Sequence, residues 1–229
     1  MNTKLKVIIP ARGGSKGVPG KNIKEINNIP LLAYPIIAAQ QCKFISDIYV
    51  STDDTNIASV AIKYGAKVIT RPDDLAQDDS LDIDVMRHAV DYLEDWEDIV
   101  HLRATTPMIK SDILDQAIKI YNNNTNCTSL RSAHEAPETA YKWFKLVDKY
   151  WNGLFDHEFE GEYYNWSRQQ LPKTYQANGY IDIIKPNQFM NNQSLHGDKI
   201  LAYITPYAHE IDTPEDFKIL QALYDKDKK

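Results

Sequence analysis

The chain of 229 residues carries 26 basic and 32 acidic side chains, which gives a formal net charge of −6. That balance argues against a nucleic-acid partner, because nucleic-acid-binding proteins present a broad basic surface. No segment approaches the ~20 consecutive apolar residues of a membrane span, and the first apolar run, residues 7–11, is too short for a signal peptide. We therefore expect a cytoplasmic protein without a membrane partner.

Strand and helix patterns alternate through the first 130 residues. The predicted strands are Lys4–Pro10, Asp47–Thr52, Lys67–Thr70, Asp98–Leu102 and Thr128–Ser132. The predicted helices are Pro30–Cys42, Thr55–Tyr64, Leu81–Trp96 and Ser111–Tyr121. Pro35 inside the first of these helices predicts a kink or an early break, because proline removes a backbone hydrogen bond. This βαβ series predicts an α/β fold with a mostly parallel sheet covered on both sides.

Residues 136–175 differ in character, because tyrosine, tryptophan and phenylalanine alternate with charged residues and show no helical period. We expect an inserted, hairpin-rich arm within a single domain that spans residues 1–229. Its aromatic surface either covers the core of its own subunit or forms a self-association surface. The segments that follow predict two strands and a closing helix, at Ala177–Ile184, Ile200–Thr205 and Thr213–Tyr224.

The first predicted strand runs into a glycine-rich cationic loop, which reads I-P-A-R-G-G-S-K-G-V-P-G-K-N over residues 9–22. Glycines let backbone N–H groups approach a phosphate closely, and Arg12, Lys16 and Lys21 supply the opposite charge. Ligands of α/β proteins bind at the carboxyl ends of strands, where this loop begins. We therefore predict a polyphosphate-binding loop, with a solvated surface loop as the alternative.

Two common phosphate loops do not fit this segment. A Walker A loop needs a glycine five positions before its Gly-Lys pair, but Gly20-Lys21 has Ser15 there. The dinucleotide fingerprint fails because Gly13 and Gly14 are adjacent and no reading frame places its third glycine. A P-loop kinase and an NAD dehydrogenase are therefore excluded as good matches.

Glu210 and Asp212 are a candidate metal-binding pair. They are two residues apart at the end of a predicted strand, so we expect their carboxylates on one side and Ile211 in the core. Magnesium commonly takes one or two carboxylates and completes its shell with phosphate and water. The alternative is that these acidic residues only favour the dipole of the helix that begins near Thr213.

Several motifs in order resemble those of the acylneuraminate cytidylyltransferases, also called CMP-sialic acid synthetases. The loop is similar to the I-P-A-R-x-G-S-K-G-x-P-x-K-N signature of that family. The other matching segments are S-T-D-D at 51–54, R-P at 71–72, T-T-P at 105–107, R-Q-Q-L-P at 168–172, N-G at 178–179 and E-I-D-T-P-E-D at 210–216. The resemblance runs from Lys4 nearly to the C-terminus.

This resemblance implies a Rossmann-like nucleotidyltransferase fold and a homodimer with a swapped arm at residues 136–175. The implied reaction joins CTP to the anomeric hydroxyl of a nine-carbon α-keto acid sugar and releases pyrophosphate. The implied catalytic residues are Arg12, Lys21 and Asp212, and the implied nucleotide-binding residues are Arg12, Gly13, Ser15, Lys16, Lys21, Asn22 and Arg71. The implied sugar-binding residues are Arg103, Lys142, Arg168, Gln169 and Asn178, and Glu210 and Asp212 are the implied magnesium ligands. Arg71 has a second interpretation, as an ordinary surface arginine before a turn.

The sequence departs from the family pattern at four positions. Arg103 replaces a glutamine, Tyr180 and Asp182 replace the alanine and tyrosine of N-G-A-I-Y-I, and Glu210 replaces an aspartate. The added positive charge of Arg103 and the changed side chains of the sugar site would suit a differently substituted sugar. Legionaminate is therefore an alternative to N-acetylneuraminate. Two further functions also stay open at this point: a cytidylyltransferase for the eight-carbon acid KDO, and a non-catalytic nucleotide-sugar-binding protein.

Overall fold

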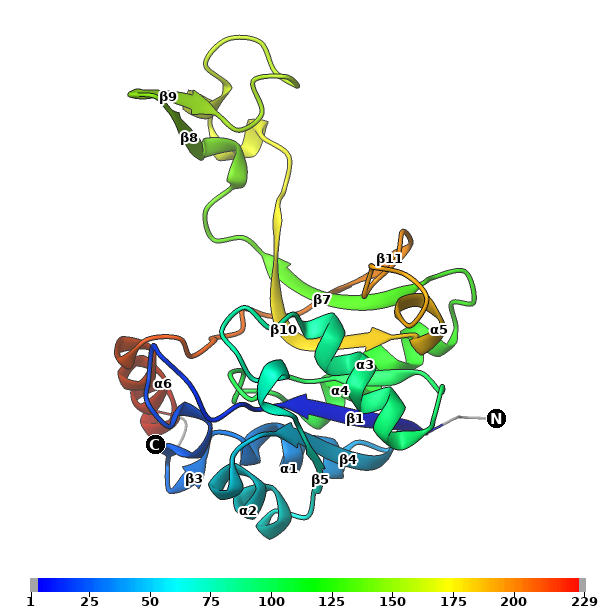
Figure 1. The fold of residues 1–229 in the computed structure, drawn as a ribbon. Helices are drawn as coiled ribbons and strands as arrows, with labels where there is room; N and C mark the ends of the chain where they lie inside the picture. Colours follow the sequence, from blue (N-terminus) through cyan, green and yellow to red (C-terminus); the bar gives the residue numbers. More distant parts are fainter. Residues whose placement is uncertain (1–3, 227–229) are drawn as a thin grey trace.

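A computed structural model describes residues 4–226 of the chain. Its centre is a seven-stranded sheet in the order β11-β7-β10-β6-β1-β4-β5 (Figure 1). The strands are β1 (Leu5–Pro10), β4 (Ile45–Thr52), β5 (Lys67–Thr70), β6 (Ile99–His101), β7 (Ser129–Glu135), β10 (Tyr175–Ile184) and β11 (Ile200–Ile204). Only β10 runs antiparallel to its neighbours in this sheet. The predicted α/β fold with a mostly parallel sheet is therefore confirmed.

Helices cover both faces of the sheet. They are α1 (Ala33–Gln41), α2 (Thr55–Lys63), α3 (Asp82–Leu93), α4 (Ser111–Asn122) and α5 (Pro186–Phe189), whereas α6 (Pro214–Lys226) packs away from the two faces. Side chains alternate along β1, so Val7 and Ile9 pack with α1, α2 and α4, while Ile8 packs with α3 and α5. This alternation gives the expected three layers. No helix within residues 4–226 is long and apolar enough to cross a membrane.

The first helix begins later than predicted. Pro30 ends a two-residue strand, β3 (Ile29–Pro30), which pairs with β2 (Glu25–Ile26), and α1 starts at Ala33. Pro35 therefore falls in the first turn of α1, where its missing N–H removes no intrahelical hydrogen bond. The expected break at Pro35 is wrong for this reason.

The predicted helix over residues 81–96 is shorter in the structure. It ends at Leu93, because Glu94 takes a left-handed conformation with φ of 49°. A left-handed residue commonly terminates a helix, although glycine usually occupies that position. Sequence periodicity gave no signal for this stop.

The C-terminal helix covers the glycine-rich loop. Phe217 and Leu220 of α6 pack with Val18 of the loop, Ile26 of β2 and the fully buried Ile211. This small apolar cluster is separate from the two clusters on the faces of the sheet. The end of the chain is thereby fixed against the segment that follows β1.

Residues 136–174 form an arm between β7 and β10 that stands away from the sheet (Figure 1). Its hairpin joins β8 (Phe144–Val147) to β9 (Tyr150–Gly153), and three short 3-10 helices flank it, at Ala140–Lys142, Tyr163–Asn165 and Arg168–Gln170. Tyr163 is fully buried among aromatic neighbours, so the arm has a small core of its own. The hairpin, however, leaves Trp151 70% exposed and Tyr150 65% exposed.

Leu114 offers a direct test of how α4 packs on the sheet, because its side chain is fully buried on the inner face of that helix. Leu114→Ala should lower the free energy of unfolding by about 2–5 kcal/mol, the cost of lost apolar burial plus a cavity. Ile120→Ala is the matched control, since Ile120 lies on the same helix with 43% of its surface exposed. Urea unfolding of both variants measures the difference. Equal losses for the two variants would contradict the assigned face of α4.

Candidate active site

The glycine-rich loop has a defined shape at the carboxyl end of β1. Asp53 Oδ1 accepts a hydrogen bond from the Gly13 N–H at 3.0 Å, and Gly20 adopts φ of 65° just before a short 3-10 helix, η1 (Lys21–Ile23). The buried Asn22 side chain donates from Nδ2 to the carbonyl oxygen of Arg12 at 2.9 Å. The loop is thus an ordered turn held by its own polar groups, and Asn22 contributes to that order.

A long-range contact joins the loop to the segment before α6. Lys21 Nζ donates to the carbonyl oxygen of Ile211 at 2.8 Å and lies 3.1 Å from Asp212 Oδ1. Gly17 packs so closely that a Cβ there would collide with the backbone carbonyl of Asp212. The Ile211 N–H donates to the carbonyl oxygen of Thr105 at 3.0 Å. Cations of the loop and a carboxylate far away in sequence therefore share one site.

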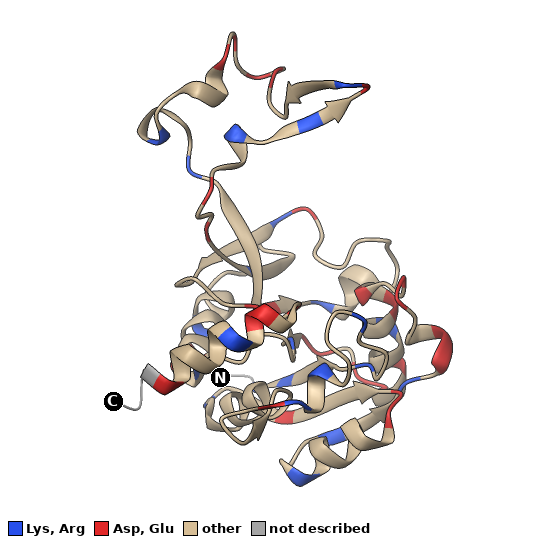
Figure 2. Ribbon diagram, turned by 90° about the vertical axis from the view of Figure 1, so that its left-hand side faces the viewer, with Lys and Arg blue, Asp and Glu red and all other residues tan. Residues whose placement is uncertain are grey.

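Two adjacent pockets open at this end of the sheet. The first, of about 330 Å³, is lined by loop residues that include Arg12, Ser15, Lys16, Lys21 and Asn22, together with Asp212. The second, of about 280 Å³, is lined by Arg12, Arg71, Asp78 and Asp82 among others. Both pockets are lined by Pro10 and Arg12 and so adjoin each other, and we refer to the two together as the cleft. Figure 2 shows basic and acidic positions interspersed over the body, so this cleft is a local feature.

Arg71 follows β5 and is only 5% exposed. Its Nη2 donates to the carbonyl oxygen of Ser51 at 2.6 Å, and its Nε donates to Ser51 Oγ at 3.1 Å. The interpretation of Arg71 as an ordinary surface arginine is therefore wrong. Two strand ends instead fix its position in the wall of the second pocket.

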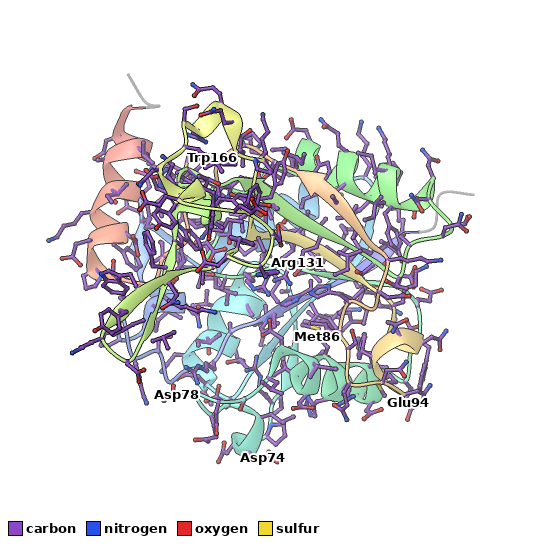
Figure 3. All side chains as sticks on the ribbon, turned by 90° about the horizontal axis from the view of Figure 1, so that it is seen from above. Asp74, Asp78, Met86, Glu94, Arg131 and Trp166 are labelled. Atoms are coloured by element: carbon purple, nitrogen blue, oxygen red, sulfur yellow. The ribbon has the colours of Figure 1, made fainter. Side chains whose placement is uncertain are left out.

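Asp78 is a charged partner of the loop that the sequence analysis did not identify. Its carboxylate pairs with Arg12 Nη2 at 2.6 Å and also with Lys16. The Lys16 ammonium and then the Arg12 guanidinium hold the pKa of Asp78 below its ordinary value. Asp78 lies at the edge of the molecule in the segment before α3 (Figure 3). No local motif marks it, because the contact depends on how two distant loops meet.

Glu210 and Asp212 do not lie on a strand, which corrects the expectation. Strand β11 ends at Ile204, and the chain from 205 to 213 is irregular. Ile211 is nevertheless fully buried as predicted. Burial raises the pKa of Glu210, and the nearby Asp212 carboxylate adds to this rise although Arg103 opposes it.

The interpretation of this acidic pair as a helix-start feature is weak. Asp216 Oδ2 accepts hydrogen bonds from the N–H groups of Asp212 and Thr213, at 3.0 and 2.8 Å. Asp216 therefore supplies the carboxylate at the start of α6, and the pair is not needed there. The carboxylate of Asp212 remains 70% exposed beside Lys21. Within the described part of the chain, no group of three or more His, Cys, Asp or Glu residues could hold a metal ion, so the candidate site offers two carboxylates.

The predicted sugar-binding residues of the sheet are already engaged within the protein. Arg103 pairs with Asp182 at 3.2 Å and with Asp82 at 3.0 Å, so its added positive charge is balanced. Asn178 is 1% exposed, and its amide group bonds to Ser132 Oγ at 2.9 Å and to Thr205 Oγ1 at 2.6 Å. This geometry favours a structural role for Asn178 in place of the predicted contact with the sugar.

The arm residues do not meet the loop within one chain. Arg168 Nη2 contacts the carbonyl oxygen of Ala136 at 3.2 Å and Glu135 Oε1 at 3.4 Å, at the base of the arm. Arg168 and Gln169 line a separate pocket of about 280 Å³ that shares no residue with the two pockets at the loop. Lys142 lies exposed at the end of a short 3-10 helix of the arm.

Comparisons with known proteins identify the family of this chain. The cytidylyltransferase family model matches residues 6–224. The chain is 36% identical over 223 residues to the CMP-N,N′-diacetyllegionaminic acid synthase of Campylobacter jejuni, covering 94% of this chain and 92% of that protein. It is 33% identical to the post-translational flagellin modification protein B of Campylobacter coli, with the same coverage. It is 29% identical to the N-acylneuraminate cytidylyltransferase of Escherichia coli, of which it spans 53%.

Solved structures share the fold. The structure of a CMP:2-keto-3-deoxy-manno-octonic acid synthetase complexed with CTP aligns with a TM-score of 0.75 at 16% identity, and covers 98% of this chain and 100% of that one. A 4-diphosphocytidyl-2C-methyl-D-erythritol synthase from Anaerococcus prevotii aligns with a TM-score of 0.66 at 12% identity, covering 98% and 97%. With the family model matching nearly the whole length, this chain belongs to the cytidylyltransferase family, and its fold is that of the nucleotidyltransferases.

Proposed function

We propose that this chain transfers CMP from CTP to the anomeric hydroxyl of a sialic-acid-like nonulosonic acid. The contact of Lys21 with Ile211 and Asp212 carries the proposal, because it places loop cations and a carboxylate around one pocket. The relatives support the acceptor class, since they include a legionaminic acid synthase and a pseudaminic acid cytidylyltransferase at 36% and 29% identity.

The reaction makes few demands on the protein beyond position and charge. The acceptor hydroxyl oxygen attacks the α-phosphorus of CTP and loses its proton to solvent, the bond from that phosphorus to the bridging oxygen breaks, and pyrophosphate leaves. Arg12, Lys16 and Lys21 would hold the phosphates and stabilise the negative charge that develops on the leaving group. The backbone N–H groups near Gly14 and the Ser15 hydroxyl can add hydrogen bonds. The phosphates would then replace Asp78 as the partner of Arg12 and Lys16.

Arg71 and Asn22 would define the nucleoside end of the cleft. Arg71 lines the second pocket, and its bonds to Ser51 use Nε and one Nη2 hydrogen, so further N–H groups would be left for a ligand. Asn22 donates to Arg12, so it would act on the nucleotide chiefly by holding the loop. This assignment gives the cytidine a position next to Arg71.

The carboxylates of Glu210 and Asp212 fit a magnesium ion. Glu210 is half-buried and has no hydrogen bond or ion pair within residues 4–226, and its raised pKa reflects burial and the second carboxylate. A divalent cation would offset the repulsion between the two carboxylates. When bound, magnesium would neutralise phosphate charge beside the acceptor. Lys21 would keep Asp212 oriented toward that position.

The arm would complete the site across a homodimer. Its hairpin exposes Leu146, Tyr150 and Trp151 by 61%, 65% and 70%, which suits burial against a second copy. In a two-fold dimer each arm would reach the other body, and each of the two sites would receive one arm. Arg168 and Lys142 would then bind the carboxylate of the acceptor, for which arginine provides a bidentate contact.

Product analysis tests the proposed function. The purified chain is incubated with CTP, Mg²⁺ and separate acids, which are N-acetylneuraminate, N,N′-diacetyllegionaminate, pseudaminate and KDO. Mass spectrometry should detect the CMP conjugate of at least one nine-carbon acid together with pyrophosphate, and EDTA should abolish both products. Turnover of KDO alone, or of none of the acids, would contradict the proposal.

Removal of a loop cation should slow the transfer strongly. Arg12→Ala and Lys21→Ala should each lower kcat by roughly two orders of magnitude, the scale for losing one preorganised charge donor. Lys218→Ala is the control, because Lys218 is an exposed cation on α6 with 80% of its side chain accessible. Initial rates at saturating CTP measure the effect. Rates within threefold of the parent for both loop variants would show that the loop does not hold the phosphates.

Mixed dimers test whether the arm acts on the partner. Arg168→Ala and Asp212→Asn chains, each inactive alone, are mixed under conditions that allow subunit exchange. A shared site should regain up to about a quarter of parental activity, since half of the dimers are mixed and each mixed dimer holds one intact site. A mixture of Arg12→Ala with Asp212→Asn chains should stay inactive, because both residues line the same pocket of one body. Recovery in neither mixture, despite verified exchange, would place Arg168 outside a shared site.

A further inference from the structure

A polar row crosses the sheet beside the cleft and is not used by the reaction described above. His101 on β6, Asp182 on β10 and Arg131 on β7 stand in register on adjacent strands. His101 also pairs with Ile8, so the row lies on the face that carries α3. Charged side chains on the inner strands of a sheet are unusual, because a charge removed from water is costly unless it is matched.

Asp182 holds two arginines in place. It is 1% exposed, and its Oδ2 accepts from Arg103 Nη1 at 3.2 Å. Its Oδ1 has no hydrogen bond and lies 3.8 Å from Arg131 Nε, which is itself buried without a hydrogen-bond partner among the described residues. Asp182 Oδ1 thus attracts Arg131 electrostatically, while neither atom makes a hydrogen bond among the described residues. The register of β10 shifts in the stretch that contains Gly179. A Cβ at Gly179 would come within 2.7 Å of Arg103 Cδ, so the glycine leaves the space that Arg103 occupies.

The outer end of Arg131 is available to a ligand. Its side chain is 37% exposed, and it makes no hydrogen bond within residues 4–226. In the view from above, Arg131 lies between Met86 of α3 and Trp166 of the arm (Figure 3). A guanidinium whose inner side is fixed by a buried carboxylate is a preorganised donor.

The cluster borders the place where the acceptor must bind. Asp82, which pairs with Arg103, lines the same pocket as Arg12 and Arg71. A Cβ at Gly179 would meet both Arg103 and Glu210, so these two side chains lie against the same glycine, and Glu210 also interacts electrostatically with Asp182, Asp212 and Lys21. An acceptor that reaches the α-phosphate beside these carboxylates would therefore extend over Arg103 and Arg131.

The local charge indicates which group of the acceptor Arg131 would bind. Arg103 and Arg131 are balanced by Asp82 and Asp182, and burial lowers the pKa of His101 to about 4, so that histidine is neutral at pH 7. Glu210 adds no positive charge. A cluster without excess positive charge has little attraction for a carboxylate, whereas a neutral carbonyl can still accept an N–H bond. Among the neutral groups of such sugars, the amide carbonyl is a strong acceptor.

We propose that Arg131, positioned by Asp182, donates a hydrogen bond to the amide carbonyl of an acylamino group on the acceptor. The inference rests on the proposed function and refines its acceptor to nonulosonic acids that carry an acylamino group. Arg131 would thereby favour these acids over acids with a hydroxyl at the same carbon. Arg103 would lie beside Arg131 in the acceptor site, where ion pairs with Asp82 and Asp182 hold it.

Two acceptors that differ at one substituent test this inference. N-acetylneuraminic acid and its deaminated analogue, which has a hydroxyl in place of the acetamido group, are compared with the parent and with Arg131→Met. The variant should lower kcat/KM for the acetamido acid on the order of tenfold or more, mainly through KM, as for a lost charged hydrogen bond. It should change kcat/KM for the analogue by less than about twofold and leave the KM for CTP unaltered.

Further variants separate binding from structure. Arg131→Lys retains a donor and should keep part of the preference for the acetamido acid, whereas Asp182→Asn should weaken that preference without altering the KM for CTP. Lys199→Met, a cation change at the edge of the same sheet, should leave both acceptors unaffected. Equal losses with the two acceptors in Arg131→Met, or no loss with either, would overturn the role of Arg131. Conversion of no nine-carbon acid by the parent would overturn the proposed function, whereas preferred conversion of the deaminated analogue over the acetamido acid by the parent would overturn this inference alone.

Discussion

The contact of the glycine-rich loop with the segment before the last helix is the constraint on which the site depends. Lys21 binds the backbone of Ile211 and the carboxylate of Asp212, and Gly17 lies against the carbonyl of Asp212 without room for a side chain. Helix α6 adds an apolar cluster that includes Val18 and Phe217. Ordering a loop with several glycines costs much conformational entropy, and these contacts offset that cost. These contacts with the C-terminal part of the chain order the loop.

Most cations of the site already have an acidic partner in the chain. Arg12 and Lys16 pair with Asp78, Lys21 pairs with Asp212, and Arg103 pairs with Asp82 and Asp182. The basic side chains of these pairs are 25–81% exposed, except that of Lys21, which is 14% exposed. Exposed pairs of this kind contribute little to stability, so phosphates can replace the carboxylates at small cost. Under the proposed function, the site would exchange these internal partners for substrate phosphates. Buried Asp182 is different, because it fixes side chains permanently.

The sequence predicts the parts of this structure that depend on local pattern. Alternating apolar runs identify every strand of the central sheet, and Asp54 caps α2 by accepting from Asn56 and Ile57. The loop is recognisable because glycine and cations follow a strand directly. Family motifs then connect the loop to nucleotide chemistry, which the spacing of the residues alone does not identify.

The remaining features depend on contacts between distant segments, which no local pattern records. Asp78 reaches the loop only because the segments after β1 and β5 lie side by side. Asp212 lines the loop pocket from an irregular segment, so strand alternation was the wrong reason for the correctly predicted burial of Ile211. Asn178 carries a family motif, but its amide is used up by Ser132 and Thr205. The arm's aromatic pattern left open which surface it covers.

The most direct test of the central contact compares two glycines of the loop. A Cβ at Gly17 would collide with the carbonyl of Asp212, whereas a Cβ at Gly14 would meet nothing within 4 Å. Isothermal titration with CTP should give a Kd for Gly17→Ala that is on the order of tenfold or more above the parent, because the displaced loop misplaces Lys21. Gly14→Ala should keep the parental thermal stability, since the added methyl group has open space around it. Lys218→Ala, an exposed change on α6, should bind CTP within about twofold of the parent. Parental affinity in Gly17→Ala, with its thermal stability retained, would contradict the dependence of nucleotide binding on this contact.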